Sequence, residues 1–131
     1  MKVEWIKVLG RPLSYQASRK KGYIERIKAC GNQHFPTPWT VPLSLQIFYV
    51  INRTAGSIPD LDNLDKVVID ALKSIAYLDD RQIRSRKSER LFCGEPVVCS
   101  AGIMPPASDL QKTAQLKKQE CIFIGITDVL L

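Results

Sequence analysis

The chain has 131 residues, of which 45% are hydrophobic, so it is long enough to bury one core and of ordinary length for a single domain. No apolar run approaches a membrane span and the N-terminus lacks the apolar region of a secretory signal, which predicts a cytoplasmic protein that does not enter a membrane. The formal net charge of +6 favours an anionic partner.

The cysteines and the single histidine do not suggest a metal-binding motif. Cys30, Cys93, Cys99 and Cys121 form no C-x-x-C pair, and free thiols are the usual state of cysteines in a reducing compartment. His34 lies in a turn with no partner nearby in sequence, so it is expected to be a loop residue rather than a ligand or a base. Zinc is therefore not expected.

The first half of the chain predicts a strand, a helix and a second strand. Residues 3–9 are apolar and bounded by a glycine, which indicates a strand. A basic loop and helix follow over residues 14–30, and Gly31 is placed to end that helix. Residues 43–51 are β-branched and apolar, which is typical of a central strand.

The second half predicts an acidic helix over residues 61–76 and a strand over 82–92. A continuous apolar run over 121–126 suits a final, buried strand. Between these strands the sequence is less regular, with a possible short strand at 97–99 and a possible helix over 109–119.

This order predicts an α/β fold in one domain over residues 1–131. A βαβαβ core is followed by a C-terminal strand, and a mixed sheet packs against helices. No internal repeat or low-complexity linker divides the chain.

The acidic helix and the residues after it contain more carboxylates than a helix needs. Asp60 and Asp62 are two residues apart, so in an extended segment both point to one side. Asp79 and Asp80 follow the helix and could fold back toward its start along the next strand. Three converging like charges would favour a bound divalent cation.

The same residues also fit an ordinary helix start. Asp60 or Asp62 can serve as the N-cap, and Asp62 can pair with Lys66 one turn later. Spacing alone does not decide between metal binding and capping.

Two segments resemble the RusA-type Holliday-junction resolvases in order, spacing and residue type. The main one is Asp60-Leu-Asp62-Asn63-Leu-Asp-Lys66-x-x-x-Asp70-Ala-Leu, followed by Asp79-Asp80-Arg-Gln-Ile83. The other is Gly10-Arg-Pro-Leu-Ser14, which is similar to the turn that follows the family's first strand. The resemblance covers roughly residues 8–90.

The resemblance implies an endodeoxyribonuclease that resolves four-way junctions or other branched DNA by phosphodiester hydrolysis, in recombination and repair. It implies Mg²⁺ as cofactor, with Mn²⁺ as a possible substitute, held by Asp60, Asp62 and Asp80. Lys66 would assist at the phosphate. It also implies a homodimer, whose two-fold symmetry suits cutting symmetry-related strands.

Three neighbouring residues have secondary roles in this interpretation. Asn63 is expected to make structural hydrogen bonds at the helix start, and Asp70 is expected to orient Lys66. Asp79 is included as the neighbour of the proposed ligand Asp80.

Basic residues gather near these motifs and predict a DNA-binding surface. In a strand, alternate residues from Gln82 to Arg90 share one face, and Ile83 starts the other. A charged edge strand protected against aggregation would look the same. The predicted DNA-binding residues are Arg19, Lys20, Lys21, Arg81, Arg84, Arg86 and Arg90. A further basic cluster, later in the chain, comprises Lys112, Lys117 and Lys118.

Two other functions remain open at this point. The first is a non-catalytic DNA-binding relic of the same fold. The second is a nuclease of the same fold that cuts flaps or replication forks rather than four-way junctions.

Overall fold

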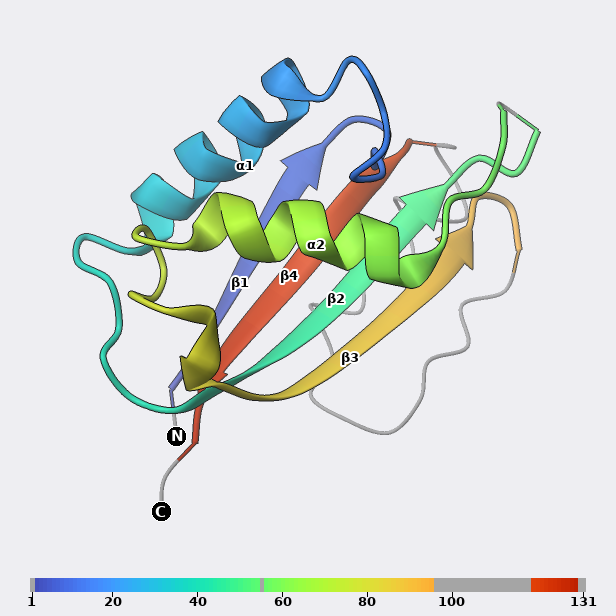
Figure 1. Ribbon diagram of the computed structural model, residues 1–131. Helices are drawn as coiled ribbons and strands as arrows, with labels where there is room; N and C mark the ends of the chain where they lie inside the picture. Colours follow the sequence, from blue (N-terminus) through green and yellow to red (C-terminus); the bar gives the residue numbers. More distant parts are fainter. Residues whose placement is uncertain (1, 55, 96–118, 130–131) are drawn as a thin grey trace.

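The computed structural model describes residues 2–54, 56–95 and 119–129. In these ranges the predicted βαβαβ core and C-terminal strand are confirmed (Figure 1). The predicted strand at 97–99, and all but the last residue of the predicted helix at 109–119, lie outside the described residues. The elements in chain order are β1 (Val3–Leu9), α1 (Lys21–His34), β2 (Leu43–Ile51), α2 (Leu61–Leu72), the 3-10 helix η1 (Asp80–Gln82), β3 (Ile83–Phe92) and β4 (Cys121–Asp128).

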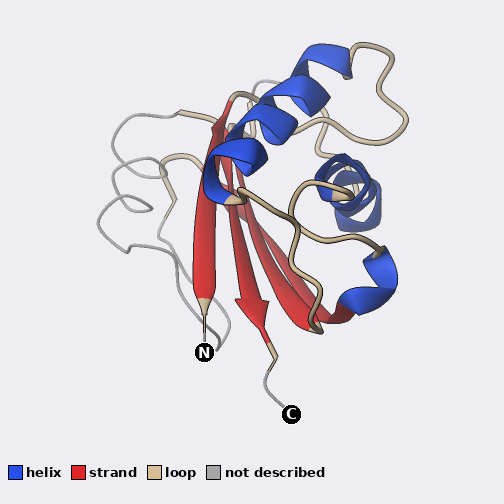
Figure 2. Cartoon of the chain, turned by 90° about the vertical axis from the view of Figure 1, so that its left-hand side faces the viewer, coloured by secondary structure: helices blue, strands red, loops and turns tan. Residues whose placement is uncertain are grey.

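The four strands form one mixed sheet in the order β1-β4-β2-β3. β4 is antiparallel to both of its neighbours, whereas β2 and β3 are parallel and are joined through α2. Both helices lie on the same face of the sheet (Figure 2). Within the described part of the chain, no helix is both long and apolar enough to cross a membrane.

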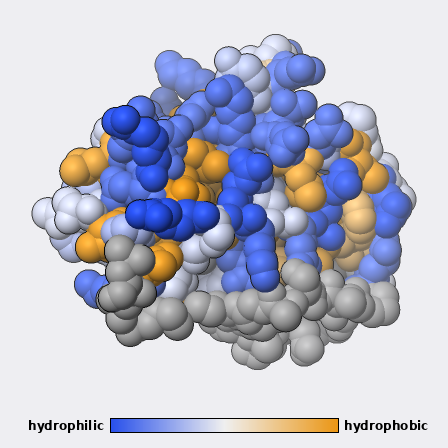
Figure 3. Space-filling model, turned by 60° about the horizontal axis from the view of Figure 1, so that its bottom comes forward, coloured by the Kyte–Doolittle hydropathy of each residue, from blue (hydrophilic) through white to orange (hydrophobic). Residues whose placement is uncertain are grey.

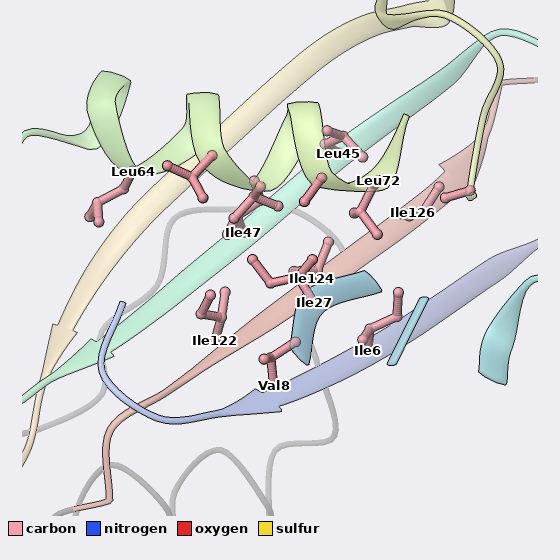
Figure 4. Close-up of a cluster of buried hydrophobic side chains, with 14 of the residues drawn as sticks. Ile6, Val8, Ile27, Leu45, Ile47, Leu64, Leu72, Ile122, Ile124 and Ile126 are labelled. Carbon is pink, nitrogen blue, oxygen red and sulfur yellow. The ribbon is translucent and has the colours of Figure 1, made fainter. Parts of the chain in front are cut away.

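The main core fills the space between the sheet and the two helices. Leu64 and Leu72 of α2 point toward the sheet, where Ile47 of β2 and Ile124 of β4 meet them (Figure 4). These four side chains are fully buried. Each such burial stabilises the fold by about 1.5–3 kcal/mol, so α2 is held firmly across the strands.

α2 ends at Leu72, four residues earlier than predicted. Lys73 is extended and Ser74 has a φ of 72°, which turns the chain away from the helix axis. The Tyr77 hydroxyl donates to the Ile69 carbonyl at 2.6 Å and ties the turn to the last helical turns. The apolar spacing continues to Ile75 and so did not reveal this turn.

α1 continues past Gly31 to His34, so the prediction that Gly31 ends the helix was wrong. Gly31 is buried against α2: a Cβ atom at this position would lie 2.9 Å from Leu72 Cδ2 and 3.0 Å from Ile75 Cγ2. His34 is therefore the last residue of α1 rather than part of a loop, and its Nδ1 lies 3.2 Å from Glu4 Oε2. The glycine permits close helix packing and does not stop the helix.

Gly31→Ala tests this explanation, because helix propensity and packing predict opposite signs. In a free helix, alanine stabilises by about 1 kcal/mol relative to glycine. Here the added methyl overpacks the α1–α2 contact, which typically costs about 1–3 kcal/mol, so the free energy of unfolding should fall. Urea titration measures it.

Gly22→Ala in the same helix is the matched control. A Cβ atom there meets only the Arg26 guanidinium at 3.7 Å, an ordinary contact, so the variant should be as stable as the parent or more so. If Gly31→Ala stabilises the protein as Gly22→Ala does, close packing is not the reason for the glycine.

Candidate active site

Asp60 and Asp62 lie at the N-terminal end of α2 with their side chains available. Asp60 holds the N-cap position, but its carboxylate makes no capping hydrogen bond. The side chain of Asp62 is 92% exposed. The predicted pair of Asp62 with Lys66 is not formed, because Lys66 Nζ lies 3.6 Å from Asp70 Oδ2 instead. The contact expected between Asp70 and Lys66 is thus present.

The turn after β1 holds the loop that leads into Asp60. The Arg11 guanidinium donates to Glu120 Oε2 at 2.5 Å and to the Ser57 carbonyl at 2.9 Å. The same Glu120 oxygen accepts the Asn52 amide at 2.9 Å. The turn that begins at Gly10, which has a φ of 111°, therefore supports the loop between β2 and the acidic start of α2.

β3 brings basic side chains back along the sheet to this helix start. Arg86 Nη2 lies 3.5 Å from Asp62 Oδ1. Further along the strand, Arg90 Nη1 donates to the carbonyl of Pro59 at 3.1 Å. The predicted proximity of a basic strand to the carboxylates therefore exists in the structure.

The strand faces differ from the prediction at the start of β3. Leu43 pairs with Ile83 but Ser44 pairs with Ser85, so Arg84 is an extra residue in a bulge. As a result Ile83 packs against the helix-side core, on the same side of the sheet as Arg86, and does not start the opposite face.

Gln82 is also placed differently from the prediction. It belongs to η1, and its amide donates to the carbonyls of Trp39 and Val41 at 2.8 and 3.0 Å. It therefore anchors the turn before β3 instead of joining a basic strand face.

Asp65 is a buried carboxylate that sequence analysis missed. Only 1% of the residue is exposed. It accepts hydrogen bonds from the Tyr49 hydroxyl at 2.6 Å and the Ser88 hydroxyl at 2.5 Å, and Arg86 Nε lies 3.3 Å away. Burial raises the pKa of Asp65, while these hydrogen bonds and the arginine charge lower it in part.

Asp65 holds Arg86 in place next to Asp62. The side chain of Asp65 is 2% exposed and that of Arg86 is 43% exposed, so loss of this half-buried pair costs less than the roughly 3–5 kcal/mol of a fully buried one. The exposed Arg86–Asp62 contact is worth at most about 1 kcal/mol. The helical spacing contained a signal: Asp65 lies four residues after Leu61 and three before Val68, inside the apolar stripe.

Asp79 and Asp80 occupy η1 and the residue before it. Asp79 caps η1: it accepts the Arg81 amide at 2.9 Å, and the hydrogen bonds and charge of Arg81 lower its pKa. Arg81 is bound to Asp79 although 88% of its side chain is exposed. Asp80 lines an open hollow of about 440 Å³ together with Arg84 and Arg86.

The three aspartates do not converge within one chain. α2 starts where β2 and β3 end, and η1 lies where these strands begin, so Asp80 is at the opposite end of the helix from Asp60 (Figure 1). A helix of 12 residues is about 18 Å long, far more than one cation can bridge. Among the described residues, no three acidic, histidine or cysteine side chains form a group suited to a metal.

The N-terminus of α1 lies at the same end of the molecule as that of α2 (Figure 1). Arg19 and Lys21 are exposed there, and Lys20 Nζ donates to the Tyr15 carbonyl at 2.6 Å. The backbone carbonyl of Asn63 accepts the Tyr15 amide at 2.9 Å, which ties the loop before α1 to the start of α2. The role expected of the Asn63 side chain stays a prediction. The face at the bottom of the view in Figure 1 is mainly hydrophilic with small hydrophobic areas (Figure 3).

The family model named Endodeoxyribonuclease RusA matches residues 4–99, which is more than half of the chain. The match runs from β1 through β3 and includes Asp60, Asp62 and Asp80. A search of the curated proteins finds no match. The resemblance found in the sequence motifs is confirmed, and the chain belongs to the RusA family of endodeoxyribonucleases.

Proposed function

We propose that the protein is a metal-dependent nuclease that cuts branched DNA, chiefly four-way junctions, in recombination and repair. One observation carries the proposal: two exposed carboxylates, Asp60 and Asp62, stand at a helix start beside an arginine that a buried carboxylate holds in place. Carboxylates suit a catalytic cation, and the arginine suits a phosphate beside it.

The donor atoms at the start of α2 suit a hard divalent cation. Asp60 and Asp62 offer only oxygen ligands, which magnesium and manganese prefer. Magnesium is usually held by one or two carboxylates together with substrate phosphates and water. When bound, the cation would polarise the scissile phosphate and lower the pKa of an attacking water.

The neighbouring cations have separate roles in this proposal. Arg86 holds a phosphate of the DNA backbone, because Asp65 fixes its Nε and leaves the outer edge of the guanidinium at the surface. Lys66 lies one turn after Asp62 and stabilises negative charge that develops on the phosphate in the transition state. Asp70, 3.6 Å from Lys66, keeps that ammonium near the site.

Asp80 reaches the metal only from a second copy of the chain in this proposal. Within its own chain it lies beyond the far end of α2, whereas the family resemblance makes it a metal ligand. A two-fold homodimer with antiparallel α2 helices would bring Asp80 of each copy toward Asp60 and Asp62 of the other. Such an enzyme has two equivalent sites for two symmetry-related strands.

Asp62→Asn tests the metal site, because it preserves size and removes a charge that the cation needs. Mutating a residue that hydrogen-bonds to a metal ligand typically lowers metal affinity or activity by about 10- to 100-fold. Loss of a ligand itself should therefore reduce cleavage by more than about 100-fold. The assay uses labelled four-way, forked, flapped and linear DNA, with and without Mg²⁺. Binding in the absence of metal should persist.

The matched control is Glu25→Gln, which removes an exposed carboxylate from α1 and should cut like the parent. A parent protein that binds DNA but cuts none of the four substrates in the presence of Mg²⁺ would support the non-catalytic relic. A preference for flaps or forks over four-way DNA would support the other alternative.

Arg86→Ala tests the phosphate contact. Loss of one phosphate contact weakens binding to all sequences alike and lowers the slope of log affinity against log salt by about 1. Lys87→Ala is the control, since Lys87 is the residue after Arg86 within β3 and points to the opposite face of the sheet. Equal salt slopes for the two variants would contradict the assigned role of Arg86.

Asp80→Asn tests the shared site in combination with Asp62→Asn. Each variant alone should be inactive, but a mixed dimer would contain one site with both aspartates intact. With random pairing half of the dimers are mixed, so co-expression should restore about a quarter of parental nicking. A co-expressed sample as inactive as the separate variants, or an Asp80→Asn variant that is active alone, would rule out the shared site.

A further inference from the structure

Tyr15 presents an exposed aromatic ring beside the first turn of α2. The residue is 46% exposed, although large aromatic side chains usually find cover in a folded protein. Its backbone is fixed, because the Tyr15 amide donates to the Asn63 carbonyl at 2.9 Å. The residue is therefore held at a defined place next to Asn63, and its ring lies beside Lys66.

Two ammonium groups lie against this ring. Lys66 Nζ is 4.8 Å and Lys20 Nζ is 5.1 Å from the ring centroid. Lys20 is held there by hydrogen bonds to the carbonyls of Tyr15 and Ala17 at 2.6 and 3.3 Å. An aromatic face flanked by cations is a common way to hold a base and its phosphate.

A hollow of about 240 Å³ opens beside the ring, between α1 and α2. One wall is a single stripe along α1 and its N-cap residue, in which Ile24 lies four residues after Lys20 and four before Lys28. The floor is aliphatic and comes from α2. The lining residues are Tyr15, Lys20, Ile24, Lys28, Val67, Asp70 and Ala71.

The chemistry of the hollow selects a flat, mainly apolar group that carries a negative charge. The aromatic and aliphatic surfaces suit a ring, and three lysines against one aspartate leave the rim positive. Lys20 and Lys28 are separated by about 12 Å along the axis of α1, a spacing that suits two different phosphates of one strand. A nucleotide outside the duplex stack meets these conditions, because the faces of a base inside a duplex are covered by its stacked neighbours, whereas an unpaired base can offer a free face.

We propose that the hollow between α1 and α2 binds an unpaired nucleobase of branched DNA, stacked on Tyr15, with the adjoining phosphates at Lys20 and Lys28. The inference rests on the proposed function in that it takes DNA as the ligand. Stacking on an aromatic side chain contributes about five- to 150-fold in affinity, and an exposed cation–π contact about two- to fivefold. A base therefore displaces the Lys66 ammonium from the ring and frees it for the phosphate.

The test measures binding without divalent metal, by fluorescence anisotropy, to two forked duplexes. One fork has a short unpaired tail with normal bases, and the other has the same tail without bases. The parent should prefer the normal tail. Tyr15→Ala should weaken binding to that tail by about five- to 150-fold and remove the preference, whereas Tyr15→Phe keeps the ring and should retain it.

Leu78→Ala removes another exposed side chain, outside the hollow, and should bind both forks like the parent. Thermal unfolding checks that each variant is folded. A parent that binds both tails equally, or a folded Tyr15→Ala variant that keeps the preference, overturns the inference. The proposed nuclease activity still stands after such a result if Asp62→Asn abolishes cleavage. Conversely, a parent that prefers the normal tail but cuts no DNA would support the base-binding hollow and contradict the nuclease activity.

Discussion

Because β2 and β3 are parallel, the chain must return along the sheet between them, and α2 makes that return. The helix start therefore lies where β2 ends, and β3 begins at the other end of the sheet. Residues later in β3 therefore lie closer to the start of α2 than residues at its beginning. This direction brings Arg86 and Arg90 to the acidic helix start and leaves Asp80 behind at the beginning of the strand.

The parts of the fold that depend on local pattern were predictable from the sequence. Apolar runs gave β1, β2 and β4 to within two residues, and the helical spacing gave the position of α2. The aspartate motif was strong enough to identify the family, because its spacing combines several residue types over one helix. Local pattern thus predicted the elements and the family.

What could not be predicted depends on contacts between distant segments. Gly31 is a helix stop in isolation, but close packing against Leu72 makes it an interior residue of α1. Asp65 was not singled out from the sequence, because the groups that bind it, Tyr49 and Ser88, belong to two different strands. In each case the partner is remote in sequence, so helical spacing alone carried only part of the signal.

The bulge at Arg84 has a consequence for how this sequence can change. Side chains alternate between the faces of a strand, and the extra residue lies where that alternation is interrupted, so removing Arg84 would leave a regular ladder with Ile83 and Arg86 still on the helix side. A one-residue slip of the later part of the strand would instead bring Lys87 and Glu89 to the helix side in place of Arg86 and Ser88. Asp65 would then face an acid where it now accepts the Ser88 hydroxyl. Loss of one residue is thus tolerable at the bulge and far less so later in β3, and an evolutionary record of the family should show that difference.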